Sequence, residues 1–218
     1  MRFHDLIRAA ENKYNRLLTL LILVYLVSPF LVEQSMGAVI VLLVFLGGVV
    51  IVIHQIQHSQ WALRMHIGLV FLALLLRICS DLFAHLPNDR RLLVASSTAI
   101  FLAFLALSVY LILRELAIVE QVTTDIIKGG ICVYFLLGFL WAALYEIVYS
   151  FDASSFTAES TPLTRADLTH FSFTTLTTVG YGDISPASRV ARVLANLEGM
   201  VGVIYPAVFI ARLVGLYR

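Results

Sequence analysis

The sequence predicts an all-α integral membrane protein with six transmembrane helices and a re-entrant segment between the fifth and the sixth. Two observations support this fold class. The 218 residues are 60% hydrophobic and only 13% charged, whereas about a quarter of the residues in a soluble domain are charged. Six apolar runs also approach the ~20 residues that a helix needs to cross a bilayer. They fall near residues 16–32, 36–54, 61–79, 92–113, 126–149 and 187–214.

These runs divide the chain into four parts. Residues 1–15 are charged and periodic, and they form either an interfacial helix or a solvated leader to the first span. Residues 16–113 form a four-helix transmembrane domain, and residues 114–125 form a polar connector. Residues 126–218 form a second domain with two spanning helices and the re-entrant segment between them.

The basic residues near the N-terminus predict the orientation of the chain. An even number of crossings places both termini on the same side of the membrane. The first sixteen residues carry Arg2, Arg8, Lys13 and Arg16, and short loops rich in Lys and Arg stay in the cytoplasm. We therefore expect a multi-pass protein of the cell membrane, in contact with lipid, with both termini cytoplasmic and the loop between the last two spans outside.

Composition and motif content exclude several classes of function. A formal net charge of +1 gives no reason to expect a nucleic-acid partner. His54 and His58 share one helical turn, but two ligands do not make a metal site. The sequence contains no catalytic elbow, phosphate-binding glycine loop or nucleotide fingerprint. We expect neither an enzyme nor a protein that needs a cofactor.

The loop between the last two spans begins with a helix signal. Pro162 precedes the stretch LTRADLTHFSFTTL, in which Thr164 followed by Asp167 fits an N-cap with an acid in the first helical turn. The stretch is too short and too mixed to span a bilayer. We expect a short helix here, inside a segment that enters and leaves on one side of the membrane.

The residues after this short helix permit an irregular backbone. The helix would deliver Thr177 and Thr178 into the sequence VGYG, where Gly180 and Gly182 can adopt conformations closed to other residues. At membrane depth an unpaired carbonyl costs several kcal/mol, so irregular backbone is tolerated only inside protein or beside a watery cavity. These carbonyl groups need a partner, and a dehydrated cation can be one.

The stretch TTVGYGD, residues 177–183, resembles the signature of the potassium-channel family. In that family, four copies of the loop replace the water shell of the ion with carbonyl oxygens. The resemblance covers about residues 126–216, and it implies a pore helix and a selectivity filter in a six-transmembrane, one-pore-loop channel of the bacterial type. It further implies that K+ is the permeant ion and is held by the backbone oxygens of Thr178, Val179, Gly180 and Tyr181. The hydroxyl of Thr178 would form the innermost site.

The same resemblance implies an assembly of several chains and assigns roles around the filter. A ring of carbonyl groups needs several copies of the loop, so we expect a homotetramer with the pore on its axis. Thr177, Gly182 and Asp183 would flank and support the filter, and Phe171 is the better match for an aromatic residue packed around the filter tyrosine. His170 replaces a residue that is often tryptophan in relatives, and its role is either packing or a pH-sensitive contact.

Two further groups of residues border the predicted filter. Thr174 stands where some bacterial relatives carry a glutamate behind the filter, so the inactivation mechanism linked to that carboxylate is not expected here. Acidic side chains of the outer segment could concentrate cations at the mouth, but for Asp152 and Glu159 we favour a solvated loop. The acidic residues are Asp152, Glu159, Asp167 and Asp183.

The sixth span contains candidate gating residues. Gly202 occupies the place of a flexible glycine in the inner helix of relatives. It is either a gating hinge or a glycine kept for close packing, since Gly199 lies three residues earlier and small residues serve helix interfaces in membranes. Pro206 should kink the helix. Helical phase places Val203, Pro206 and Ile210 along a largely apolar cavity.

Polar and aromatic residues within the fifth and sixth spans need an explanation of their own. Glu198 lies inside the sixth span, and an acid at such a position is functional by default. It either braces the back of the filter through a hydroxyl of the short helix or titrates as a gating group. Trp141, Tyr145 and Tyr149 recur at every fourth residue, which favours an aromatic anchor facing lipid headgroups.

The fourth span lacks the basic residues of a voltage sensor. Arg90 and Arg91 precede its apolar run and Arg114 follows it, with no basic residue between. The sequence thus predicts a K+-selective channel with passive conduction and only weak voltage dependence. The first alternative is a K+ transporter subunit, which would carry four divergent filters on one chain. The second is a non-conducting or regulatory membrane sensor with a channel-like pore domain.

Overall fold

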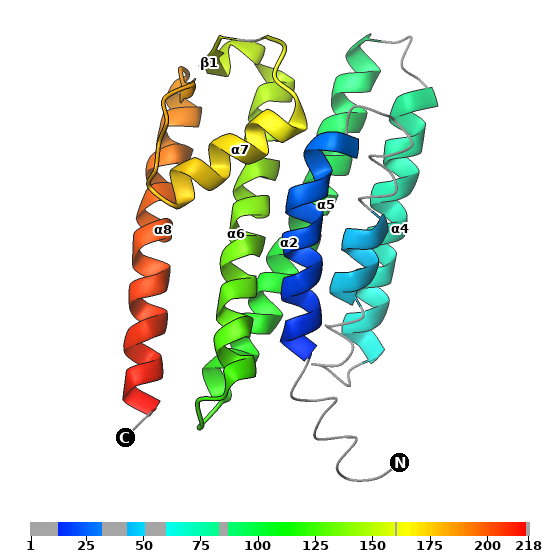
Figure 1. Ribbon diagram of the computed structural model, residues 1–218. Helices are drawn as coiled ribbons and strands as arrows, with labels where there is room; N and C mark the ends of the chain where they lie inside the picture. The colour runs from blue at the N-terminus through cyan, green and yellow to red at the C-terminus, as the bar shows by residue number, and fades with distance from the viewer. Residues whose placement is uncertain (1–12, 32–42, 51–59, 83–86, 160, 217–218) are drawn as a thin grey trace. The chain divides into compact units, whose positions relative to one another are not determined.

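A computed structural model of the chain describes residues 13–31, 43–50, 60–82, 87–159 and 161–216 (Figure 1). The described part is almost entirely helical, which confirms the predicted helical class. Its elements are α2 (Lys13–Leu31), α4 (Gln60–Leu82), α5 (Pro87–Ile118), α6 (Thr124–Phe151), a 3-10 turn (Ala153–Ser155), β1 (Phe156–Ala158), α7 (Arg165–Leu176), β2 (Ile184–Pro186) and α8 (Arg189–Leu216). Residues 43–50 are also helical.

Three helices in the described part are long and apolar enough to cross a membrane. They are Arg91–Ile118, Thr124–Phe151 and Arg189–Leu216, and they correspond to the fourth, fifth and sixth predicted spans. A shorter apolar helix covers Leu63–Leu76 within the third predicted span. The chain is therefore a membrane protein, while the full set of six crossings stays a prediction.

Several predicted features lie outside the described residues. These are most of the leader, residues 1–12, both ends of the second predicted span, and the pair His54 and His58.

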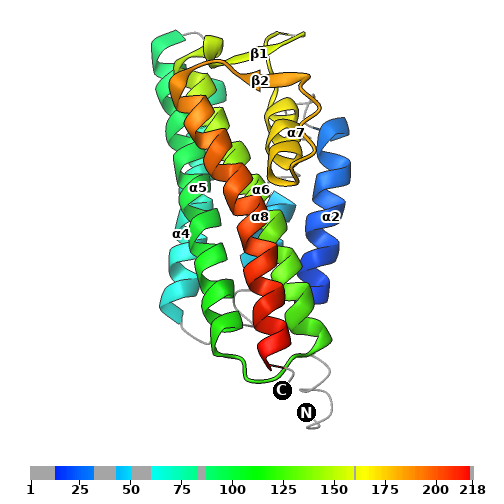
Figure 2. The ribbon, with the colours of Figure 1, turned by 90° about the vertical axis from the view of Figure 1, so that its left-hand side faces the viewer.

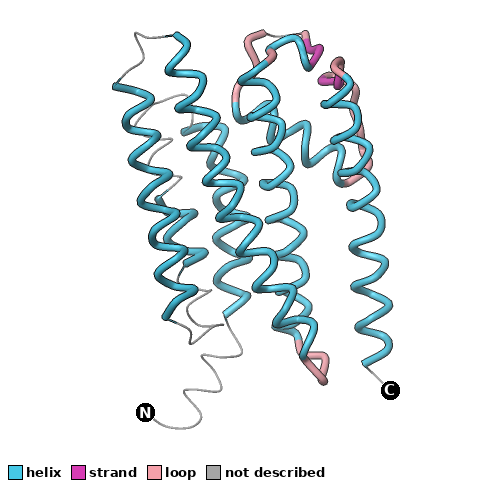
Figure 3. Tube along the Cα trace, turned by 180° about the vertical axis from the view of Figure 1, so that it is seen from behind, coloured by secondary structure: helices cyan, strands magenta, loops and turns pink. Residues whose placement is uncertain are grey.

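The connector between the fourth and fifth spans is short. Helix α5 continues to Ile118 and α6 begins at Thr124, so only residues 119–123 are non-helical (Figure 3). The hydroxyl of Thr123 accepts a hydrogen bond from the backbone N–H of Ile126 at 3.3 Å, and Asp125 lies in the first turn of α6. A hydroxyl acceptor and an acid are the groups that satisfy the free N–H groups of a helix start.

The described residues form two compact units. The first contains the described residues that fall within 1–67, 107–136 and 209–218. Within it, Tyr14 at the start of α2 is fully buried. Its backbone N–H donates to Asp125 Oδ1 at 3.2 Å and its hydroxyl donates to Glu115, which also pairs with Lys13. Polar contacts of this kind let charged groups stay inside an otherwise apolar unit, because each has a partner.

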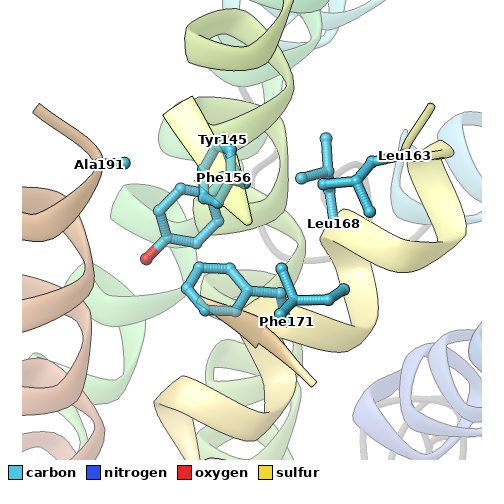
Figure 4. Close-up of a cluster of buried hydrophobic side chains, with 7 residues drawn as sticks. Tyr145, Phe156, Leu163, Leu168, Phe171 and Ala191 are labelled. Atoms are coloured by element: carbon cyan, nitrogen blue, oxygen red, sulfur yellow. The ribbon is translucent and has the colours of Figure 1, made fainter. Parts of the chain in front are cut away.

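The second unit contains residues 68–106 and 137–208. Here β1 and β2 form a two-stranded antiparallel sheet, in the register Phe156 with Pro186 and Ala158 with Ile184 (Figure 2). Side chains of both strands join a buried cluster with residues of α6, α7, α8 and the loop before α7 (Figure 4). Its members are Tyr145, Phe156, Leu163, Leu168, Phe171, Ile184 and Ala191. This cluster fixes α7 within the unit.

Candidate functional site

The start of α7 is closed by a reciprocal pair of hydrogen bonds. The side chain of Thr164 accepts from the backbone N–H of Asp167 at 3.3 Å, and the carboxylate of Asp167 accepts from the backbone N–H of Thr164 at 2.7 Å. This capping box satisfies two of the free N–H groups of the first turn. Next to it, Arg165 pairs with Glu146 of α6 at 2.7 Å. The predicted helix start is confirmed.

At the other end of α7 the chain turns back on the last helical turn. The carbonyl oxygen of Thr174 accepts from the N–H groups of both Val179, at 2.9 Å, and Gly180, at 3.1 Å. The N–H of Thr178 donates to Thr175 O at 3.0 Å. These bonds use carbonyl groups that have no partner within the helix, and they hold the first residues of the VGYG sequence close to the helix end.

Beyond this turn, residues with a positive φ angle alternate with residues without one. The φ angles of Thr178, Gly180 and Gly182 are 60°, 50° and 80°, while no positive φ occurs at the intervening Val179 and Tyr181. Alternating left-handed and right-handed residues turn every second peptide unit over, so that successive carbonyl groups can point to the same side. Glycine takes such angles at no steric cost. For the β-branched Thr178 this angle is a genuine outlier, which indicates a strained and specified conformation.

Every residue from 177 to 183 is exposed in the single chain. The side chain of Tyr181 is 73% exposed and that of Val179 is 54% exposed. The ring of His170 lies parallel to that of Tyr181, with ring centroids 5.9 Å apart, and its Nε2 lies 3.0 Å from Asp183 Oδ2. Two contacts from one histidine therefore connect α7 to the outer end of this segment.

Phe171 packs inside the buried cluster of its own chain, and its expected place around the filter tyrosine stays a prediction. Its ring packs against Tyr145 at 4.9 Å and Phe156 at 5.5 Å between centroids, inside the buried cluster (Figure 4). Within this chain the aromatic ring that stacks on Tyr181 belongs to His170. Phe171 thus supports the segment indirectly, by holding α7 in place.

The back of α7 carries the contact predicted for Glu198. Its carboxyl group is fully buried, and Oε1 lies 2.6 Å from the hydroxyl of Ser172 on α7. The expected contact with a hydroxyl of the short helix is confirmed. The hydroxyl of Tyr145 donates to Oε2 at 2.5 Å.

The prediction that Tyr145 belongs to an aromatic anchor facing lipid headgroups was wrong. Its side chain is 0% exposed, and Trp141 and Tyr149 pack against the same buried cluster. Tyr149 also accepts a hydrogen bond from the N–H of Leu163 at 2.9 Å. The spacing of four residues placed the three rings on one face of α6, but protein covers Tyr145 fully and the other two rings in part.

Gly202 of α8 lies directly against the end of α7. A Cβ atom at this position would fall 1.9 Å from the carbonyl oxygen of Leu176 and 2.8 Å from its carbonyl carbon. At Gly199, one turn earlier, nothing lies within 4 Å of such an atom. The structure therefore supports the packing interpretation of Gly202, because its close neighbour is Leu176, the last residue of α7. The hinge stays a prediction.

The remaining predicted residues of α8 are accessible in the single chain. Val203 and Ile210 are each 59% exposed, and Pro206 lies inside the continuous helix and is half-buried. Only 6% of the most apolar window of α8 is buried, against 44% for α6. Helix α8 therefore presents apolar surface that this chain does not cover.

The outer acidic residues have separate local roles. Asp152 caps the 3-10 turn through the N–H of Ser154 at 3.0 Å, and hydrogen bonds from the hydroxyl and N–H of Ser154 lower the pKa of this exposed carboxyl. Glu159 is exposed. Asp167 belongs to the capping box and Asp183 to the His170 contact. Solvated or structural roles therefore account for Asp152 and Asp167.

Sequence reasoning missed two features of the site. Nothing in the residue type of Thr178 predicts a left-handed backbone, since β-branched residues avoid it. Gly138 of α6 was also overlooked. Its carbonyl oxygen lies 2.7 Å from the hydroxyl of Ser172, and a Cβ atom there would fall 2.7 Å from the ring of Phe173. A glycine inside an apolar helix is a signal for such a close approach.

Comparison with known proteins identifies the class of the C-terminal region. Residues 129–218 match a family model described as an ion channel. This region, which carries α7, the alternating segment and α8, is therefore an ion-channel domain. The match supports an ion-channel family that is broadly potassium-channel-like for these residues. No curated protein and no solved structure matched the chain.

Proposed function

We propose that this chain is one subunit of a K+-selective channel that conducts passively through a homotetrameric pore. The observation that carries the proposal is the alternating backbone of residues 178–182 within the sequence TTVGYGD. Carbonyl groups turned to one side can replace the water shell of a dehydrated cation. Thr178, Val179, Gly180 and Tyr181 would supply these oxygens, and the Thr178 hydroxyl the innermost one.

The homotetramer is supported by what one chain leaves uncovered. A single copy of the loop offers carbonyl oxygens from one side only, and an ion needs them all around. Residues 177–183 are exposed, and α8 keeps most of its apolar window uncovered. Copies related by an axis beside Tyr181 would complete the ring and cover part of α8. In this arrangement Val203, Pro206 and Ile210 line the inner cavity.

The charges of α5 support weak voltage dependence. Arg91 and Arg114 are exposed, and the 22 residues between them include no lysine or arginine. Their separation of 23 positions corresponds to ~35 Å of helix, longer than the ~30 Å apolar core of a bilayer. Charges at the two edges cross little of the field, whereas each charge that crosses fully is worth ~2.3 kcal/mol per 100 mV. The first four helices would then serve as support or receive a non-electrical signal.

The full chain, reconstituted in liposomes with K+ inside and Na+ outside, tests this proposal. We expect K+ efflux that is at least ~100-fold faster than Na+ flux, from particles whose mass corresponds to four chains. In planar bilayers with symmetric K+, conductance should rise only shallowly with voltage. Equal K+ and Na+ fluxes would contradict selectivity. A steep voltage dependence that is lost when Arg90 and Arg91 are neutralised would contradict the assignment of α5.

A second candidate function is a membrane sensor whose pore is permanently closed. Residues 177–183, which we call the filter segment, are compatible with it, because carbonyl geometry alone does not open a pore. Absence of K+ flux from verified tetramers, across pH, membrane tension and voltage, would favour this alternative.

A further inference from the structure

Behind the filter segment, three helices meet at one buried polar group. Glu198 of α8, Ser172 of α7 and Tyr145 of α6 are each 0% exposed. Tyr145 belongs to the apolar cluster, and in Figure 4 its hydroxyl is the one oxygen among the labelled side chains. The fourth member is the backbone carbonyl of Gly138 on α6. We call these four groups the Glu198 network.

The oxygen atoms of the network make three close contacts. Tyr145 Oη lies 2.5 Å from Glu198 Oε2, Ser172 Oγ lies 2.6 Å from Glu198 Oε1, and Ser172 Oγ lies 2.7 Å from Gly138 O. All are hydrogen-bond distances for oxygen pairs. Each contact needs one proton between its two oxygens, because two lone pairs facing each other at such distances repel.

The hydroxyl groups cannot supply all three protons. A tyrosine and a serine each carry one O–H, and a backbone carbonyl carries none. Two protons are therefore available for three contacts if the carboxyl group is ionised. A protonated carboxyl provides the third. Oε1–H then donates to Ser172 Oγ, the Ser172 hydroxyl donates to Gly138 O, and Oε2 accepts from Tyr145.

The surroundings agree with a neutral group. Among the described residues, the ion pairs involve Lys13, Arg165 and His170, and none of them includes Glu198. A buried carboxylate without a cationic partner is costly. In the neutral form, each of the four groups has a donor or an acceptor facing it, so nothing in the network is left unsatisfied.

We propose that Glu198 is a positioning residue that acts in its protonated form, as a hydrogen-bond donor that holds α7 between α6 and α8. The proposal rests on the proposed function, because it assigns Glu198 a part in keeping the selectivity filter in place. Ser172 lies five residues before Thr177. The Glu198 network therefore holds α7 little more than one helical turn before the filter segment begins. Gly138 lets α7 approach α6 closely enough for Ser172 to reach its carbonyl.

The protonation state can be tested without any ion flux. The infrared spectrum of the full chain in detergent at neutral pH should contain a protonated carboxylic C=O band that disappears in Glu198→Gln. In Tyr145→Phe, which loses the donor to Oε2, this band should shift to higher frequency and remain. If the wild-type spectrum minus that of Glu198→Gln contains only carboxylate bands, the proposal is wrong. Glu159→Gln, at an exposed acid, is the matched control and should remove carboxylate bands only.

The positioning role is tested by selectivity. Glutamine keeps both functions, since its NH2 can donate to Ser172 and its carbonyl can accept from Tyr145, so Glu198→Gln should retain the wild-type ratio of K+ to Na+ flux. Glu198→Leu and Ser172→Ala break the link to α7, and each should lower this ratio by about tenfold, the effect of one buried hydrogen bond. Retention of tetramers by size-exclusion chromatography verifies that the variants assemble.

The outcomes separate the two proposals. If the wild-type chain passes no K+ but shows the protonated band, the channel function fails and the assignment of the proton stands. If Glu198→Gln loses selectivity as fully as Glu198→Leu, the negative charge is what matters and the positioning role is overturned. Wild-type selectivity in both Glu198→Leu and Ser172→Ala would overturn it too. If Glu198→Leu does not assemble, Ser172→Ala decides.

Discussion

Helix α7 and the filter segment that follows it are neighbours in the chain, but they depend on different partners. Five of the twelve residues of α7 are buried in this chain, namely Leu168, Phe171, Ser172, Thr174 and Leu176. All seven residues from 177 to 183 are exposed. The helix is thus stabilised by contacts within its own chain. The filter segment is oriented by the end of that helix and, in the proposed tetramer, completed by ions and by other copies.

Because of this difference, we expect mutations in the two regions to have different effects. Changes in the filter segment should act on ion selectivity while the subunit stays folded. Changes behind or before α7 should act first on packing, and reach selectivity only as far as they move the end of α7. Three variants, taken from the largest expected effect to the smallest, test this separation.

Gly180→Ala should abolish selective K+ flux while the chain still folds. The φ angle of Gly180 is 50°, and no atom of this chain lies within 4 Å of a Cβ added there. The subunit thus has room for the methyl group, but a left-handed alanine costs about 1–2 kcal/mol, and in a ring every copy bears this cost. The measurement is the K+ to Na+ flux ratio in liposomes, with Gly199→Ala as control. Unchanged selectivity would contradict the proposal that this segment is the selectivity filter.

Gly202→Ala should destabilise the contact between α8 and α7. The added Cβ would overlap the backbone of Leu176, and overpacking typically costs about 1–3 kcal/mol. Because Leu176 is the last residue of α7, we expect a lower thermal midpoint together with a reduced K+ to Na+ ratio. Gly199→Ala, on the same helix with open space, should change neither.

A purely kinetic outcome would change the interpretation of Gly202. If the alanine variant keeps its thermal midpoint and its selectivity but opens less often, the hinge role accounts for this residue better than packing does. Single-channel recording in planar bilayers measures the open probability directly.

Thr164→Ala should have the smallest effect of the three. It removes the acceptor for the N–H of Asp167, and loss of an N-cap costs about 1 kcal/mol. We expect a slightly lower thermal midpoint and an unchanged K+ to Na+ ratio, because the cap lies at the end of α7 remote from the filter segment. Thr164→Ser keeps the hydroxyl and should restore the wild-type midpoint. A large loss of selectivity in Thr164→Ala alone would show that the two regions are not separable.

The sequence could predict those parts of the site that depend on near neighbours. The capping box of α7 involves residues three apart, so the types of Thr164 and Asp167 were sufficient. The helical spans follow from long apolar runs. Glu198 could be assigned a hydroxyl partner, because an acid within a spanning helix needs one.

What the sequence could not predict depends on contacts between distant residues. Spacing placed Tyr145 on a face of α6, but whether lipid or protein covers that face is decided by α7 and α8. The partner of Gly202 is Leu176, 26 residues earlier in the chain. The left-handed backbone of Thr178 runs against its own residue preference, so only the surrounding hydrogen bonds account for it.

The two hydrogen bonds accepted by the carbonyl oxygen of Thr174 predict which part of the proposed filter would rearrange first if it lost its bound ions. They tie Val179 and Gly180, the inner half of the segment, to the end of a well-packed helix. The outer half contacts α7 through the side chain of His170, which is accessible to water. In the proposed channel, loss of the ions should therefore let rearrangement start at Tyr181 and Gly182 and spread inward, so that the proposed innermost position at Thr178 is lost last.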